Sequence, residues 1–183
     1  MRHSTICVMI CCWMLGGLRA PIACADNWNN WRGPDARGVA ADGKYPISWN
    51  DEQHILWAVE MPGQAGSTPI VWEDRIFLTA IREKQNVARC YDWSGQQLWE
   101  VSVGQERPGK HKKASGSNSS PITDGQHVFV YFKSGDLACL DLDGNQKWHT
   151  NLQTRFGEDT LWWDLGTSPV LTRDHVIVAV VQS

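Results

Sequence analysis

The chain has 183 residues, of which 42% are hydrophobic, and these values are ordinary for one globular domain. Its formal net charge of −3 at pH 7 excludes the strongly basic surface of a nucleic-acid-binding protein and gives no reason to expect attraction to an anionic membrane. The 11 tryptophans are an unusually large number, and a repeating structural unit would explain them.

Residues 1–25 have the pattern of a secretory signal peptide. Arg2 gives a positive start, Ile6 to Leu18 form an apolar run, and Ala23-Cys24-Ala25 is a small-residue cleavage site. The apolar run is shorter than the roughly 20 residues that a transmembrane helix needs. We therefore expect cleavage after Ala25 and export to the periplasm or the extracellular space, without a transmembrane segment. Lipid attachment at Cys24 is the alternative.

After the signal, a set of predicted strands recurs along the chain. Each unit starts with a Ser/Thr-Pro step, and its prolines Pro69, Pro121 and Pro169 are spaced by 52 and then 48 residues. The strands expected from β-branched and aromatic runs between glycine-rich turns are 69–72, 75–81, 87–93 and 97–103, then 121–123, 127–133, 136–142 and 146–152, and finally 167–171 and 175–181. Apart from the signal, the sequence has no convincing helical period.

The two full units also end alike, with an Asp-x-x-Gly turn followed by a tryptophan. The matched residues are Cys90, Asp92, Gly95 and Trp99 in the first unit, and Cys139, Asp141, Gly144 and Trp148 in the second. Gly95 and Gly144 are expected where the turn needs positive φ, and Trp99 and Trp148 as apolar wedges between units. Trp57 has the same outer-strand position without the three strands that should precede it.

A period near 50 residues with four strands per unit predicts a β-propeller. The expected fold class is all-β, a partial β-propeller domain over residues 26–183. Its four-stranded antiparallel blades are predicted at 67–103 and 119–152, with a truncated blade at 167–183 and an orphan strand around Trp57. Equivalent points of adjacent blades should lie further apart than the ~5.5–6 Å between the Cα atoms of a disulfide, so Cys90 and Cys139 are expected to be buried free thiols.

Gly135, Leu137, Asp141, Gly144 and Trp148 fit the pattern G-x-L-x-x-x-D-x-x-G-x-x-x-W. On these residues the chain resembles the PQQ-like, quinoprotein-type propeller repeat. The opening Trp28-Asn29-Asn30-Trp31-Arg32-Gly33-Pro34 resembles the start of exported bacterial propellers of this group. The resemblance covers about residues 28–183 and implies a ring of seven or eight blades, of which this chain would be the N-terminal fragment.

The resemblance implies two functions. One is a dehydrogenase that uses pyrroloquinoline quinone (PQQ) and calcium, which needs carboxylate and amide calcium ligands and a carboxylate base. Residues 26–183 offer no assignable set of this kind, so we name no catalytic, cofactor-binding or metal-binding residue. The leading expectation is therefore a non-catalytic exported scaffold without a cofactor, which binds a protein, peptide or glycan through its loops. A fragment of the PQQ- and calcium-dependent dehydrogenase is the alternative.

Two long connections are the candidate binding surface. In a propeller, the link from an outer strand to the next inner strand crosses one face, so adjacent links should lie together. The link 104–117 is basic and the link 154–166 is acidic and aromatic; their candidate residues are Arg107, Lys110, His111 and Lys112, and Asp159, Trp162, Trp163 and Asp164. The alternatives are solvated charges for the first link and inter-blade packing for the tryptophans. Open blade edges could also support self-association.

Overall fold

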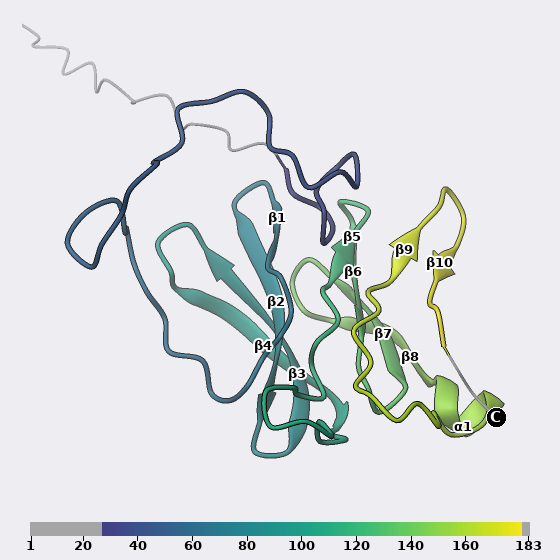
Figure 1. The fold of residues 1–183 in the computed structure, drawn as a ribbon. Coiled ribbons are helices and arrows are strands. Elements are labelled where there is room, and N and C mark those ends of the chain that lie inside the picture. The colour runs from purple at the N-terminus through teal and green to yellow at the C-terminus, as the bar shows by residue number, and fades with distance from the viewer. Residues whose placement is uncertain (1–26, 181–183) are drawn as a thin grey trace, which may run out of the picture.

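The computed structural model describes residues 27–180, so the expected signal peptide, its Ala25 cleavage site and Cys24 lie outside the described residues. The strands form antiparallel sheets that lie side by side like part of a fan (Figure 1). The first blade is β1 (Ile70–Trp72), β2 (Arg75–Arg82), β3 (Gln85–Asp92) and β4 (Gln97–Gln105). The second is β5 (Ile122–Thr123), β6 (His127–Tyr131), β7 (Asp136–Asp141) and β8 (Gln146–Asn151). The third has β9 (Val170–Leu171) and β10 (Val176–Ile177).

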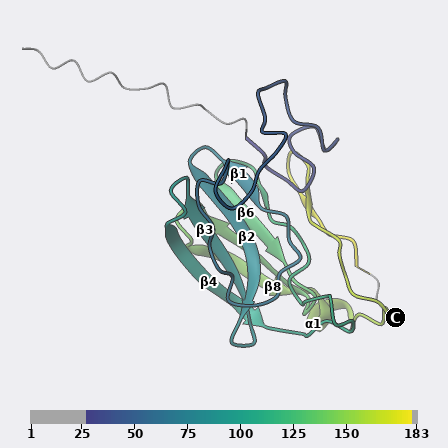
Figure 2. The same cartoon turned by 60° about the vertical axis from the view of Figure 1, so that its left-hand side comes forward.

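This arrangement confirms the predicted all-β partial propeller. Each full blade has its strands in sequence order, from the inner strand outward, and Figure 2 shows the two full blades stacked against each other. Residues 55–59, expected as an orphan strand, form no strand in the structure. An outer strand is hydrogen-bonded to the rest of its blade, and no described residue supplies that ladder.

One short helix, α1 (Leu152–Phe156), was not expected, because the sequence analysis extended the last strand to Leu152 and found no helical period; both expectations were wrong. The oxygen of the Asn151 side chain accepts a hydrogen bond from the Thr154 N–H at 2.9 Å, which caps the helix at its first turn. A single turn is too short for hydrophobic periodicity to reveal.

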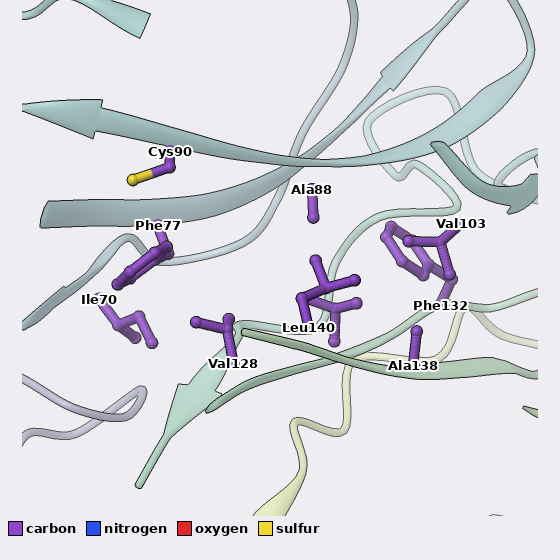
Figure 3. Packing of buried hydrophobic residues seen from close by; sticks show 10 residues of the cluster. Ile70, Phe77, Ala88, Cys90, Val103, Val128, Phe132, Ala138 and Leu140 are labelled. Atoms are coloured by element: carbon purple, nitrogen blue, oxygen red, sulfur yellow. The ribbon is translucent and has the colours of Figure 1, made fainter. Parts of the chain in front are cut away.

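The second blade is packed on both faces because its strand residues alternate in direction. Val128 and Val130 face the first blade and share a core with Ile70 and Phe77, which Figure 3 shows from close by. Phe129, between the two valines, packs instead toward β9 and β10. Each blade therefore depends on its neighbours for burial, as the radial fold requires.

The Asp-x-x-Gly turn has a clear physical reason. One oxygen of the Asp141 carboxylate accepts hydrogen bonds from the N–H groups of Asp143 at 3.0 Å and Asn145 at 2.8 Å, while Gly144 has φ +86°. The indole of Trp99, from the first blade, lies on this glycine: a Cβ there would be 2.8 Å from the ring. Trp99 Nε1 also donates to a carbonyl of the same turn at 2.9 Å. The repeated Asp, Gly and Trp thus build a contact between blades.

Trp57 makes the same contact with the first blade. Its Nε1 donates to the Trp93 carbonyl at 2.8 Å, and a Cβ on Gly95, at φ +83°, would lie 2.7 Å from its indole. The residue is held in place although the segment around it is not a strand. Trp148, the second-blade equivalent, is 41% exposed and packs against Phe129 with ring centroids 6.0 Å apart.

The Ser/Thr-Pro steps join the inner ends of the blades. The Thr68 N–H donates to the Ser120 hydroxyl at 2.8 Å, and the Ser120 N–H donates to the Ser168 hydroxyl at 2.9 Å. The second and third blades therefore each offer a hydroxyl acceptor to the backbone of the blade before it, which gives a physical reason for the recurring Ser or Thr of the step.

The opening segment pairs with the inner edge of the blades, which the sequence analysis did not predict. Trp28 and Val71 exchange two backbone hydrogen bonds of 2.9 and 2.8 Å, and the Thr123 N–H donates to the Asn29 carbonyl at 3.0 Å. The segment thus spans β1 and β5 at the end of the sheets that is uppermost in Figure 1.

Both cysteines of the blades are free thiols and are buried. Cys90 belongs to the core between the first two blades, whereas Cys139 belongs to the core on the other face of the second blade. Burial raises the pKa of Cys90 to about 12 and that of Cys139 to about 11, so both are protonated and unreactive near neutral pH.

Candidate partner-binding site

Three successive outer-to-inner links lie side by side at the lower end of the sheets in Figure 1, opposite the N-terminal segment. We call this surface the link face and define it as residues 61–66, 104–117 and 152–166. The first two links are joined where the Gly66 N–H donates to the Ser117 carbonyl at 3.1 Å and the Gln64 side chain donates to the Lys112 carbonyl at 3.4 Å.

Asp164 joins the second and third links. Its carboxylate accepts hydrogen bonds from the N–H groups of Lys110, at 2.8 and 3.0 Å, and of His111, at 3.0 Å. It also forms an ion pair with Lys133, and the two side chains are only 8% and 2% exposed. Lys133 donates in addition to the Pro108 carbonyl at 2.8 Å, so one buried ammonium holds both links.

These contacts set the charge of Asp164. Burial by itself raises the pKa of a carboxyl group, but the hydrogen bonds from Lys133 and from the two backbone N–H groups outweigh it and lower the pKa of Asp164 to about 2. The carboxylate is therefore ionised at every pH near neutrality, and its charge is matched within the fold.

Arg107 makes a second junction between the same links. Its guanidinium donates to the Gln153 side chain at 2.7 Å and pairs with Glu158 at 2.7 Å. A longer contact of 3.4 Å reaches the Asp159 carbonyl. The Asp159 side chain is buried, and one of its oxygens accepts from the Leu161 N–H at 2.9 Å while the other has no partner among the described residues.

The remaining charged and aromatic groups of the two links point to solvent. The side chains of Lys110, Lys112 and Lys113 are exposed and form no ion pair with any residue from 27 to 180. Trp162 is 79% exposed and Trp163 is 52% exposed. Their ring centroids are 5.1 Å apart at an interplanar angle of 81°, so the two indoles meet edge to face.

The structure thus brings the two predicted links together and divides their eight candidate residues into two groups. Arg107, Asp159 and Asp164 serve contacts within the fold. Five side chains are presented to solvent: Lys110, His111, Lys112, Trp162 and Trp163. Solvation accounts for the lysines but not for Arg107, and packing between the blades described here does not bury the two indoles.

Two contributors to this face were missed. Lys133 stands in the β6–β7 turn before Ser-Gly, where a lysine ordinarily reaches solvent, but here it is buried in contact with both the second and the third link. Gln153 comes from the unexpected helix α1 and receives the Arg107 guanidinium. Neither residue has a local signal in the sequence, since its partner lies more than 30 residues away.

Two cavities lie elsewhere on the described chain. One, of about 520 Å³, is lined by the opening segment around Trp31 and by residues 166–171, and the other, of about 550 Å³, is lined by residues between Asn27 and Tyr45. Among residues 27–180, no group of three or more His, Cys, Asp or Glu side chains is placed to hold a metal ion. None of the helices in this part of the chain is long and apolar enough to cross a membrane.

The fold and the link face define the class of the protein: a β-propeller with four-stranded blades joined by Asp-x-x-Gly–Trp contacts. The sequence model of the family described as "Outer membrane protein assembly factor BamB" matches residues 39–183, and the chain belongs to this family. The resemblance to the PQQ-like repeat is thereby confirmed.

Similar solved structures include BamB from Moraxella catarrhalis, with 17% identity, a TM-score of 0.47, and coverage of 68% of this chain and 33% of that one. A europium-containing methanol dehydrogenase has 17% identity, a TM-score of 0.46, and coverage of 66% and 21%. The chain therefore spans a third or less of the length of these two proteins. No curated protein matches the sequence.

Proposed function

We propose that this chain is part of an exported, non-catalytic propeller that binds a partner protein or peptide through the link face. The observation that carries the proposal is the exposed pair Trp162 and Trp163 on a link whose backbone is fixed by Asp164. Exposed indoles are costly in water and are enriched at interfaces, where they supply large contact areas. The family name, an assembly factor of outer membrane proteins, supports a protein partner and a periplasmic location.

A protein or peptide is favoured over a glycan by the geometry of the two indoles. Sugar rings stack on flat, open aromatic faces, whereas Trp162 and Trp163 meet at 81° and so offer an angled surface rather than one platform. Self-association through open blade edges stays a prediction.

The test is site-specific photocrosslinking in the intact protein inside its native cells. Trp162→benzoylphenylalanine is expected to give a discrete crosslinked product that disappears when Trp163→Ala is added. Trp49→benzoylphenylalanine, at a 68% exposed tryptophan outside the link face, is the matched control. Equal crosslinking at positions 162 and 49, or no product at position 162, would contradict the proposal.

The dehydrogenase alternative is tested separately by titrating PQQ and Ca²⁺ into the intact protein. Under the scaffold proposal neither the absorption spectrum nor the thermal midpoint changes. A saturable shift in either quantity would favour the quinoprotein enzyme.

A further inference from the structure

We propose that the exposed part of the link face binds an acidic, extended segment of the partner. This inference rests on the proposed function and adds the chemistry of the ligand. The surface, called here the lysine–tryptophan patch, consists of Lys110, Lys112, Lys113, Trp162 and Trp163.

The positive charge of the patch follows from how the acidic side chains around it are used. Asp164 is paired with Lys133 and two backbone N–H groups, and Glu158 is paired with Arg107. Asp159 is buried. Glu106 is half-buried at the β4 end of its link, where its N–H donates to the Lys84 carbonyl at 2.9 Å. Among the described residues, therefore, none of the three lysine ammonium groups has an ion-pair partner, although the formal net charge of the chain is −3.

The link that carries the indoles and the link that carries the lysines are joined directly by Asp164. The residue following Trp163 is hydrogen-bonded to the backbone N–H groups of Lys110 and His111. A ligand that spans both links would gain both apolar contact and charge attraction.

The patch is also held in place before any ligand arrives. The side chain of Lys133 fixes the second link at Pro108 and the third link at Asp164. A surface that is already ordered loses little conformational entropy on binding, so a short ligand can bind it with useful affinity.

A peptide segment fits these charges better than an anionic membrane does. At physiological salt, charges are screened over about 8 Å, so a short segment at the patch responds mainly to the nearby lysines. A membrane surface is much larger than the patch and would also face parts of this chain outside it, and the formal net charge of the chain is −3.

The test measures the fluorescence anisotropy of a labelled oligoglutamate with one central phenylalanine, titrated with the intact protein. We expect saturable binding that weakens as salt rises, and no binding of the matching oligolysine. Lys112→Glu with Lys113→Glu should raise the Kd about tenfold or more. Lys44→Glu with Arg173→Glu is the matched control, because it makes the same charge change at exposed residues outside the patch and should leave the Kd unchanged.

The aromatic contribution is measured with the same probe. Trp162→Ala should weaken binding of the phenylalanine-containing peptide more than that of plain oligoglutamate, whereas Trp49→Ala should affect neither. Circular dichroism and thermal unfolding verify that each variant keeps the wild-type fold.

Several outcomes would overturn the inference: no binding of the acidic peptide, equal weakening by the patch and control variants, or binding only to vesicles of phosphatidylglycerol. If the crosslink at position 162 persists while the acidic peptide does not bind, the partner chemistry is wrong and the proposed function stands. If neither the crosslink at position 162 nor binding of the acidic peptide is observed, the proposed function fails as well.

Discussion

The buried pair Lys133–Asp164 makes the sharpest prediction about stability. Asp164→Ala leaves the Lys133 ammonium, 2% exposed, without its counter-ion, and it removes the acceptor of two backbone N–H groups. Removing one member of a buried ion pair costs about 3 to 5 kcal/mol of unfolding free energy. Lys133→Met should cost less, about 2 kcal/mol, because the carboxylate keeps its two N–H donors.

The double variant separates this explanation from simple loss of packing. In the Asp164→Ala background, Lys133→Met removes a buried unpaired charge, so it should raise the unfolding free energy, whereas in the wild type it lowers it. Urea unfolding of the intact protein measures all four members of the cycle. If Lys133→Met destabilises both backgrounds equally, the two residues are not coupled, and Lys133 and Asp164 do not act as a clamp between the second and third links.

The pH dependence gives an independent check of the same carboxylate. The pKa of Asp164 falls from an ordinary value of 3.8 to about 2 on folding. This difference corresponds to about 2 kcal/mol of stability, which is fully present above about pH 4 and is lost as the pH falls through about 2. The advantage of the wild type over Asp164→Asn should therefore shrink over this interval, and a constant difference would refute the assignment.

Three further predictions concern the contacts between blades. Ser120→Ala should lower the unfolding free energy by about 1 to 3 kcal/mol, because an N–H of the preceding blade loses its acceptor; an unchanged urea midpoint would contradict this. Gly144→Ala should lower the unfolding free energy more than Gly38→Ala, since both positions have positive φ but only Gly144 is covered, by the Trp99 indole. Equal losses of unfolding free energy in the two variants would show that the effect comes from backbone strain alone. Cys90 should resist iodoacetamide in the folded protein and react on unfolding, because burial raises its pKa to about 12; rapid native labelling would show that the blade core opens.

The blades could be predicted from the sequence because their contacts repeat with it. The Trp99 indole covers Gly144 in the same way that the Trp57 indole covers Gly95. The same residues at the same spacing therefore recur in the sequence wherever this contact recurs. The Ser/Thr-Pro steps recur for a similar reason, since the Ser120 hydroxyl accepts a hydrogen bond from a backbone N–H of the blade before it.

The candidate site could be predicted only in part because its contacts do not repeat. The sequence places Trp162 and Lys112 on adjacent links, and it cannot show that Asp164 is neutralised by a lysine in the β6–β7 turn. The pairing of Trp28 with Val71 was also out of reach, because it uses backbone groups alone and leaves no pattern of side chains. The propeller repeat therefore predicts the blades, whereas the contacts between the links can be found only in the structure.

On the link face, one set of charged side chains stabilises the fold and another set is exposed to a partner. Asp164 stabilises the links by accepting from buried donors, and the same contacts prevent it from neutralising the lysines exposed beside it. Stability and ligand binding should therefore respond to different substitutions on one surface. Lys112→Glu changes the ligand preference and leaves the clamp intact, whereas Lys133→Met weakens the clamp, and with it the order of the patch, while the exposed charges stay unchanged. A variant set in which both properties always changed together would show that the exposed lysines are part of the fold rather than a binding surface.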